Sequence, residues 1–222
     1  AATEASSSLS ALDEADVFIV AQTDLTVNYQ VASFAIKRGI RHRGARLIVL
    51  DDQKNGLDSW AAFRWSPQDM NKAVETAKGA EAPVILFDPR GAALAGNLAV
   101  ALPNAKLVSF APGGNSLGLA ANGIREGFAP NNATAYYVLA GETAQISEAL
   151  LQALKKASFV AVQTSFQQPW AEVADVILPS PTLFEKAGSI ANTEGHIAQL
   201  TKAVETAQPG EAEIVQRLIA LV

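Results

Sequence analysis

The sequence predicts an α/β fold with a doubly wound, mostly parallel sheet in a three-layer αβα arrangement. Short apolar runs rich in β-branched residues alternate with helix-length amphipathic segments, which is the pattern of βαβ units whose sheet is covered on both faces. The chain has 222 residues, of which 49% are hydrophobic. It is therefore long enough to bury a substantial core.

Hydrophobic periodicity and the positions of glycine and proline locate the individual elements. Strands are expected at residues 16–21, 46–50, 84–87, 106–110, 135–139 and 159–163, with a shorter extended piece at 176–178. Helices are expected at about residues 27–41, 90–102, 144–156 and 212–221, and from Pro67 onward. A long connection at residues 51–65 follows a strand, where open α/β sheets place ligands or partners.

The chain is expected to form one α/β domain behind a short lead-in. Residues 1–12 are small and polar, with no basic start and no apolar stretch, so we expect a flexible segment and not a signal peptide. Residues 13–222 are expected to form two packed halves, at about 13–80 and 81–222. We further expect the chain to be a fragment of a larger subunit.

Composition excludes several functional classes. The formal net charge of −5 argues against a nucleic-acid partner, which requires a positive surface. No apolar run reaches the roughly 18 to 20 residues that span a bilayer, so direct membrane insertion is not expected. Cysteine is absent, and the two histidines, His42 and His196, lack the spacing of metal ligands. A metal site made by this chain alone is therefore not expected.

A short motif at residues 114–118 matches the G-x-S-x-G nucleophile elbow of hydrolases. Ser116 would be the nucleophile, and Asp175 and His196 follow in hydrolase order. A proline and a glycine before the motif, however, break the strand that should run directly into the serine. We favour a glycine turn in which Asn115 and Ser116 cap the next helix, and a serine hydrolase using Ser116 is an alternative from another functional class.

The loops that could bind an anion are not typical of nucleotide sites. Residues 22–24, after the first strand, lack the glycines of a dinucleotide-binding fingerprint, and Asp24 would repel a phosphate. Arg90 follows a later strand and could contact an anion, but a turn with a helix start is the interpretation we favour. The aromatic cluster at residues 60–65 is expected to pack internally, or else to be the contact surface of an interaction module.

The most specific pattern lies near the end of the chain. Residues 174–182 read ADVILPSPT and are followed by Glu185, Gly188, Asn192, Glu194, Gly195 and His196. This stretch resembles the A-D-V-h-L-P … E … G … N-x-E-G-R signature of molybdopterin oxidoreductases. That family includes formate dehydrogenase α subunits and the large iron–sulfur subunit of respiratory complex I.

Other segments resemble the same family in the same order. They are ADVFIVAQTD at 15–24, GARLIVLDDQ at 44–53, residues 65–69, residues 114–123, and AYYVLAGETA at 135–144. The resemblance thus covers nearly the whole chain and implies the fold of formate dehydrogenase and dimethylsulfoxide reductase domains. The compact spacing between residues 65 and 123 is more similar to the complex I subunit.

The sequence departs from the family where the molybdenum enzymes hold the guanine-dinucleotide tails of two pterins. Residues 22–24 and 51–53 occupy the two strand-end loops, and the arginine usual in the second loop is missing. Thr143 and Ala144 stand where Asn-Pro is usual, and His196 stands where arginine is usual. Each change removes a donor or adds negative charge near where a pyrophosphate would sit.

The resemblance therefore implies part of the large subunit of an NADH:quinone oxidoreductase-like or NAD-linked dehydrogenase, serving mainly as a scaffold for electron transfer. No catalytic residue, bound cofactor or metal is expected in this chain, and iron–sulfur clusters are expected only in upstream domains. The implied partners are other domains of the same subunit and other subunits of a respiratory or dehydrogenase complex. The implied location is cytoplasmic, peripheral to the inner membrane through that complex.

The alternative within the family is the cofactor-binding portion of a formate-dehydrogenase-like molybdenum or tungsten enzyme. Molybdopterin guanine dinucleotide would then bind in the cleft at the strand ends. The residues expected to contact it are Gln22, Thr23, Asp51, Asn115, Gly118, Gly141, Gln163, Asn192, Glu194 and His196.

Overall fold

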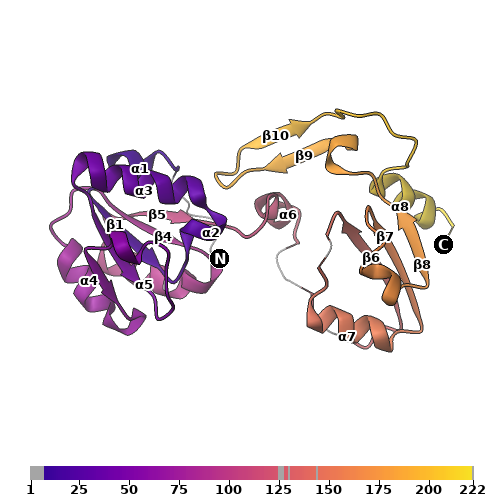
Figure 1. Cartoon of the computed structure of the whole chain (residues 1–222), viewed down its shortest axis with the longest axis horizontal. Helices are drawn as coiled ribbons and strands as arrows, with labels where there is room; N and C mark the ends of the chain where they lie inside the picture. The colour runs from indigo at the N-terminus through magenta and orange to yellow at the C-terminus, as the bar shows by residue number, and fades with distance from the viewer. Residues whose placement is uncertain (1–7, 125–127, 130, 144, 222) are drawn as a thin grey trace. The chain divides into compact units, whose positions relative to one another are not determined.

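The chain folds into two compact units, each with its own parallel sheet (Figure 1). The computed structural model describes residues 8–124, 128–129, 131–143 and 145–221. The first unit comprises Ala1–Ala121 together with Ala191–Ile197, and the second comprises Asn122–Ile190 together with Ala198–Val222. A short stretch late in the sequence thus belongs to the first unit.

The first unit contains a five-stranded parallel sheet in the order β3-β2-β1-β4-β5. Its strands are β1 (Val17–Ala21), β2 (Arg46–Leu50), β3 (Phe63–Trp65), β4 (Pro83–Phe87) and β5 (Lys106–Ser109). β1 and β4 are wholly buried, and β2 is buried except at its first residue. Strands buried on both sides need apolar residues throughout, which is why these three read VFIVA, PVILF and RLIVL.

Helices cover both faces of this sheet, with α1 and α3 on one side and α4 and α5 on the other (Figure 1). The helices of the unit are α1 (Ala11–Glu14), α2 (Leu25–Asn28), α3 (Gln30–Arg43), α4 (Met70–Ala77), α5 (Ala92–Ala101) and α6 (Ser116–Ala121). Phe18 and Val20 of β1 pack with Ile36 of α3, whereas Ile19 packs in the core that contains Leu98 of α5. The two-residue period of a strand thus produces the three-layer αβα arrangement.

The start of α5 lies so close to the end of β1 that glycine is required there. A methyl group on Gly91 would lie 2.0 Å from the carbonyl oxygen of Ala21. Asp88 caps the turn before α5 by accepting a hydrogen bond from the backbone N–H of Arg90 at 2.9 Å. This contact fixes the loop after β4 against the end of β1.

The second unit has a smaller core around a three-stranded parallel sheet in the order β6-β7-β8. Leu154, Val160, Val162 and Trp170 are its buried core residues, and the Trp170 indole N–H donates to the Thr143 carbonyl at 2.9 Å. A two-stranded sheet pairs β9 with β10. The remaining elements are β6 (Ala135–Gly141), α7 (Glu148–Lys156), β7 (Phe159–Thr164), β8 (Val176–Pro179), β9 (Gly188–Ala191), β10 (Ile197–Leu200) and α8 (Glu211–Ile219).

The α/β class and the parallel central sheet are confirmed, and each expected strand is present. The units do not part near residue 80, because β4 and β5 continue the sheet that β1 and β2 begin, and the division falls after Ala121 instead. Part of the expected lead-in is also ordered: Ala11 and Leu12 lie in α1 and are buried in the core. Residues 1–7 of that lead-in lie outside the described residues.

Several element boundaries differ from the expectation. β3, β9 and β10 were not expected, and the helix expected from residue 27 is two helices, because Tyr29 adopts φ −133° between them. α7 begins behind its cap Ser147, and the expected start, Ala144, lies outside the described residues. Within the part of the chain that the structure describes, no helix has the length and apolar character needed to cross a membrane.

Candidate functional site

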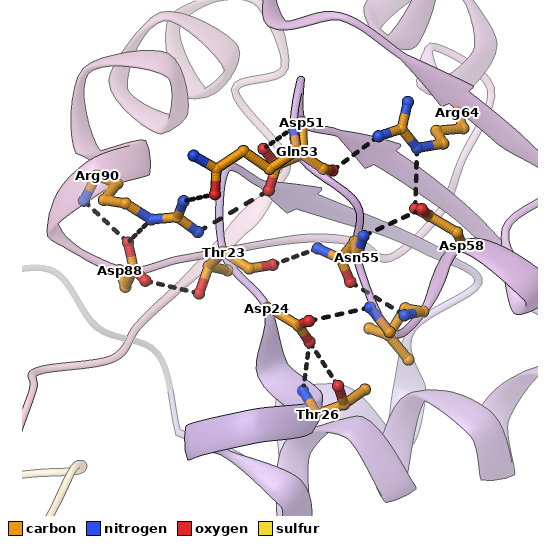
Figure 2. A network of polar contacts seen from close by, with 12 residues as sticks. Thr23, Asp24, Thr26, Asp51, Gln53, Asn55, Asp58, Arg64, Asp88 and Arg90 are labelled. Carbon is orange, nitrogen blue, oxygen red and sulfur yellow. Dashed lines mark hydrogen bonds and ion pairs between the residues drawn. The ribbon is translucent and has the colours of Figure 1, made fainter.

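A polar cluster occupies the carboxyl ends of β1, β2 and β4 (Figure 2). The chain leaves β1 toward α3 on one face of the sheet and leaves β4 toward α5 on the other. Neighbouring strands whose connections diverge in this way form a topological switch point, where open α/β sheets bind nucleotides. We call this cluster the switch-point network, and its members are Thr23, Asp24, Asp51, Gln53, Asn55, Asp58, Arg64, Asp88 and Arg90.

The loop after β1 lies at the centre of the network. The Thr23 hydroxyl donates to Oδ2 of Asp88 at 2.8 Å, and the Thr23 carbonyl accepts from Nδ2 of Asn55 at 2.7 Å. Asp24 caps α2 by accepting hydrogen bonds from the backbone N–H of Thr26 at 2.9 Å and from its hydroxyl at 2.6 Å. These polar groups are satisfied by the protein itself.

Gln22, the first residue of that loop, has a left-handed backbone with φ +50°. A non-glycine residue in this region costs about 1 to 2 kcal/mol. Its N–H donates to the carbonyl of Leu50 at 2.9 Å, which extends the pairing of β1 with β2 by one residue. The backbone conformation is thus one that favours glycine, although glutamine occupies the position.

The loop after β2 folds back over the end of the sheet. The buried Asp51 carboxylate accepts from the N–H of Gln53 at 3.0 Å, and Asp58 accepts from the N–H of Asn55 at 3.0 Å. Arg64 of β3 donates to the carbonyl of Gln53 at 2.7 Å and pairs with Asp58 at 3.0 Å. The connection at residues 51–65, which was expected to bind a ligand or partner, is therefore fixed by hydrogen bonds from its own side chains.

Arg90 extends from the turn before α5 toward three acceptors. Its Nη1 donates to Oε1 of Gln53 at 3.2 Å, its Nη2 lies 3.9 Å from Oδ2 of Asp51, and its Nε lies 3.8 Å from Oδ1 of Asp88. The side chain is about half exposed, so each ion pair contributes at most about 1 kcal/mol. The Arg90 guanidinium therefore interacts with three side chains of the network.

The network contains four carboxylates and two guanidinium groups. Burial raises the pKa of Asp24, but hydrogen bonds from Thr26 and Gly56 outweigh it, so this pKa lies below its usual 3.8. Burial, and then the charge of Asp88, raise the pKa of Tyr29 above its usual 10.0. A bound anion would meet several like charges, each pair costing about 4 kcal/mol at 4 Å with an effective dielectric constant of about 20.

The described residues bring together no group of three His, Asp or Glu side chains that could hold a metal.

Asn115 and Gly118 lie just before and within α6, and Ser116, Leu117 and Asn192 line a cavity of about 200 Å³ there. Oδ1 of Asn115 accepts from the N–H of Ala191 at 2.8 Å, which joins the start of α6 to the late segment of the first unit. A Cβ on Gly118 would lie 2.2 Å from the same oxygen. Both residues therefore hold this connection in place.

Asn192, Glu194 and His196 form a tight turn. Oδ1 of Asn192 accepts from the backbone N–H groups of Glu194 and His196, both at 2.9 Å. The Glu194 carboxylate accepts from the Ser8 hydroxyl and from the N–H of Leu9 at 2.8 Å, just before α1. These hydrogen bonds, from Ser8 first, lower the pKa of Glu194 below its usual 4.5. The turn thus links the two ends of the first unit's sequence.

Gly141 and Gln163 lie in the second unit, at the carboxyl ends of β6 and β7. Gly141 has φ +53°, and its carbonyl accepts from the N–H of Ser165 at 2.8 Å. Gln163 is fully buried, and its Oε1 accepts from the Tyr137 hydroxyl at 2.7 Å. Its Nε2 has no hydrogen-bond partner among the described residues. The expected site residues therefore lie in four local groups. These are Gln22, Thr23 and Asp51 at the switch point, Asn115 with Gly118, the turn of Asn192, Glu194 and His196, and Gly141 with Gln163 in the second unit.

The geometry does not support a nucleophile elbow at Ser116. β5 ends at Ser109, so no strand leads directly into the serine, and Ser116 begins α6 with its hydroxyl donating to the carbonyl of Pro112. The Asp175 carboxylate accepts from the N–H of Val160 at 2.8 Å, which gives it a structural role within the second unit. The favoured glycine-turn interpretation therefore describes this segment better.

Sequence reasoning missed Asn55, and for Arg90 it favoured a turn over an anion contact. Asn55 is buried, and besides bonding Thr23 its Oδ1 accepts from the N–H of Leu57 at 3.0 Å. The dense Asp and Asn content of residues 51–58 was the available signal, since these side chains bond to nearby backbone in turns. No local signal links Arg90 to Gln53, because that contact depends on how the strands are ordered.

The first unit is an α/β domain with a parallel central sheet, and the side chains at its switch point hydrogen-bond to one another and to the loops around them. The chain belongs to the molybdopterin oxidoreductase family, because the family model described as Molybdopterin oxidoreductase matches residues 1–213. The family expected from the sequence is thereby confirmed.

Similar proteins include subunits of two kinds of oxidoreductase. NADH-quinone oxidoreductase subunit 3 of Thermus thermophilus is 32% identical over 162 residues, which are 68% of this chain and 19% of that subunit. F420-dependent formate dehydrogenase 1 subunit alpha of Methanococcus maripaludis is 45% identical over 60 residues, which are 27% of this chain and 9% of that subunit. A formate dehydrogenase subunit alpha of Methanocaldococcus jannaschii is 43% identical over 61 residues, 28% of this chain and 9% of that subunit. The chain spans about a fifth or less of the length of these relatives.

Proposed function

We propose that this chain is a scaffold portion of the large subunit of an NADH:quinone oxidoreductase-like complex. The observation that carries the proposal is the switch-point network, whose polar groups bond to one another where a nucleotide would otherwise bind. The similarity to the Thermus subunit, which extends over 68% of this chain, supports the type of complex.

The residues at the switch point do not fit molybdopterin guanine dinucleotide, the cofactor that the family implies. A pyrophosphate needs free N–H donors or uncommitted cations. Here the Arg90 guanidinium faces Gln53, Asp51 and Asp88, and Asp24 holds a carboxylate at the start of α2. α2 is only four residues long, so it adds little dipole to attract an anion.

The proposal extends to partners, cofactors and location. The relatives are named as subunits, and we propose that this chain contacts other domains of its own subunit and other subunits of the complex. Iron–sulfur clusters are assigned to other domains, because cysteine is absent here. Association with the cytoplasmic side of the inner membrane would be peripheral and through the complex.

Titration with guanosine diphosphate tests the proposal, since this nucleotide supplies the guanine and pyrophosphate of the cofactor's tail. We expect no saturable heat in calorimetry up to about 1 mM nucleotide, because the donors are engaged and the field is negative. Saturable binding that disappears in an Arg90→Ala variant would contradict the proposal. Arg38→Ala, which removes an exposed arginine paired with Asp13, is the matched control.

The second candidate function is the cofactor-binding portion of a formate-dehydrogenase-like enzyme. One observation favours it: the buried Nε2 of Gln163 lacks a hydrogen-bond partner within the described part of the chain, and a buried donor without a partner is a feature of ligand sites. The formate dehydrogenase relatives are also more identical locally, over short stretches. Pterin retained in the native protein, with release caused by Gln163→Leu, would establish this function in place of the scaffold.

A further inference from the structure

An apolar patch lies on the outer side of α2 and α3, where a solvent-facing helix would ordinarily be polar. Val27, Val31 and Phe34 are 66%, 75% and 62% exposed. Val27 and Val31 also line a groove of about 420 Å³ together with Tyr29 and Phe110, whose rings lie 4.6 Å apart. Single exposed apolar residues are common, but three along α2 and α3, two of which line a groove, indicate a contact surface.

The helix α3, which carries most of this patch, packs tightly against the core on its other side. On the opposite side of α3, Ala32, Ser33, Ile36 and Gly39 are buried. Gly39 permits this close packing, because a Cβ there would lie 2.9 Å from the Phe18 ring. The apolar side chains are therefore presented on a helix that the core holds in place.

Cations continue the patch toward the end of α3. The Lys37 ammonium lies 5.8 Å from the Phe34 ring centre and 5.7 Å from that of Trp60, and the Arg41 guanidinium lies 4.9 Å from the Trp60 ring centre. Arg38 is paired with Asp13, whereas neither Lys37 nor Arg41 has an ion pair with any described carboxylate. A chain of net charge −5 thus presents two stacked cations without acidic partners. We define Val27, Val31, Phe34, Lys37 and Arg41 as the α3 patch.

We propose that the α3 patch docks an amphipathic helix of a neighbouring protein, with apolar residues in the groove and carboxylates facing Lys37 and Arg41. Helix-in-groove recognition uses such a row of apolar anchors, and opposite charges set the orientation. Lys37 and Arg41 lie six and ten residues beyond Val31 on one helix, about 9 Å and about 15 Å along its axis. The partner helix therefore needs carboxylates about 9 Å and about 15 Å from its apolar anchor.

A protein partner accounts for the patch better than an anionic lipid surface does. Among the described residues, two cations without an ion pair, Lys37 and Arg41, flank the patch, whereas electrostatic attachment to anionic lipid uses clusters of about four to eight basic residues. The negative net charge of the chain also opposes approach to such a surface. Two cations, Lys37 and Arg41, are enough to complement a protein partner that carries two or three carboxylates.

The inference deepens the scaffold function and rests on it, because the partner is sought among the proteins of the native assembly. The two can fail separately. Pterin bound at the switch point would contradict the scaffold function while leaving the α3 patch as a contact surface. A patch without a protein neighbour would contradict the inference while leaving the cofactor question unchanged.

Photo-crosslinking in the native assembly tests the inference. A photoreactive amino acid replaces Val31, and the matched control replaces Val100, an 85% exposed valine of α5 on the opposite face of the sheet. We expect Val31 to label one segment of another protein, an amphipathic helix with carboxylates about 9 to 15 Å from the labelled residue. Labelling of lipid only, of this chain only, or equally from both positions would overturn the inference.

Charge reversal supplies the second measurement. We expect Lys37→Glu with Arg41→Glu to reduce the crosslink from Val31 about tenfold, because attraction becomes repulsion. Lys72→Glu with Lys78→Glu makes the same change in net charge on α4 and at its C-cap, and should leave the yield unaltered, with both proteins showing the parent's circular dichroism spectrum. Equal yields from the parent and the Lys37/Arg41 variant would show that carboxylates do not face these cations, and would overturn the proposed partner chemistry.

Discussion

Asp24 combines two structural roles at the end of β1. Its carboxylate caps α2 through Thr26 and also accepts from the N–H of Gly56 at 3.0 Å in the loop after β2. One side chain therefore joins two of the loops that would otherwise be free to bind a ligand. This arrangement shows how negative charge at the switch point serves the fold.

We expect Asp24→Ala to lower the free energy of unfolding by about 1 to 2 kcal/mol at pH 7, since a helix cap and a loop contact are lost. Because the folded pKa is lowered, the carboxylate's contribution is fully present above the usual value of 3.8 and is lost as pH falls through the folded pKa. Urea unfolding at pH 7 and pH 3 measures the difference. A cost that stays constant between these values, or one matched by Asp52→Ala at an exposed neighbouring position, would contradict this role.

Gly91 and Gly96 give a matched pair, since Gly91 is the N-cap of α5 and Gly96 lies within the helix. Gly91→Ala would place a methyl group 2.0 Å from the carbonyl of Ala21, so we expect about 1 to 3 kcal/mol of destabilisation. Nothing lies within 4 Å of a Cβ at Gly96, inside α5, so Gly96→Ala should stabilise by about 0.5 to 1 kcal/mol. Thermal unfolding compares the two variants, and equal effects would refute the close approach of α5 to β1.

The sequence alone predicts residues that immediately follow buried strands, and it predicts side-chain contacts less well. Thr23 and Asp51 could be placed at the carboxyl ends of the strands because β1 and β2 are evident from their apolar runs. The contacts of Arg90 with Gln53 and of Asn55 with Thr23 join different loops, and so depend on strand order. Strand order arises from packing of the whole sheet, which no local pattern encodes.

At the scale of elements, the turn at residues 192–196 acts as a clamp on α1. The Glu194 carboxylate accepts a hydrogen bond from the N–H of Leu9. Because α1 is only four residues long, this helix has little stability of its own. Ala11 and Leu12 must nevertheless remain buried in the core beside α3. The signature residues near the end of the chain thus stabilise its start.

We expect Glu194→Gln to increase the hydrogen-exchange rate of the Leu9 amide about threefold to tenfold, because a charged acceptor becomes a weaker neutral one. Nuclear magnetic resonance measures this rate directly. Glu205→Gln is the matched control on an exposed carboxylate. If the two variants leave the Leu9 amide equally protected, the clamp does not operate.

Elements with continuous apolar runs were predicted, whereas short or exposed elements were not. β3 has three residues, two of them exposed, so its sequence FRW shows no strand pattern. β9 and β10 are mostly exposed and pair only with each other, so their stability comes from backbone pairing more than from burial. Periodicity detects burial, and elements that bury little escape it.

At the scale of the molecule, the two units differ in how much core they contain. Among the described residues, the second unit has four fully buried core members, whereas the first has two larger clusters on either face of its sheet. Since buried apolar area is the main source of stability, the second unit should open first.

We expect amides of Phe159–Thr164 in β7 to exchange at lower urea concentration than those of Val17–Ala21 in β1. Hydrogen exchange with mass spectrometry in increasing urea follows both peptides in the same sample. Coincident opening of the two peptides would show that the units unfold as one cooperative body, contrary to this expectation.

We propose that the switch point serves as scaffold and does not hold a pterin dinucleotide. Elemental analysis for molybdenum and tungsten, together with fluorescence of oxidised pterin, on the native full-length protein tests this proposal directly. We expect far less than one metal and one pterin per chain. Near-stoichiometric metal and pterin would contradict it and would make this domain part of a catalytic cofactor site.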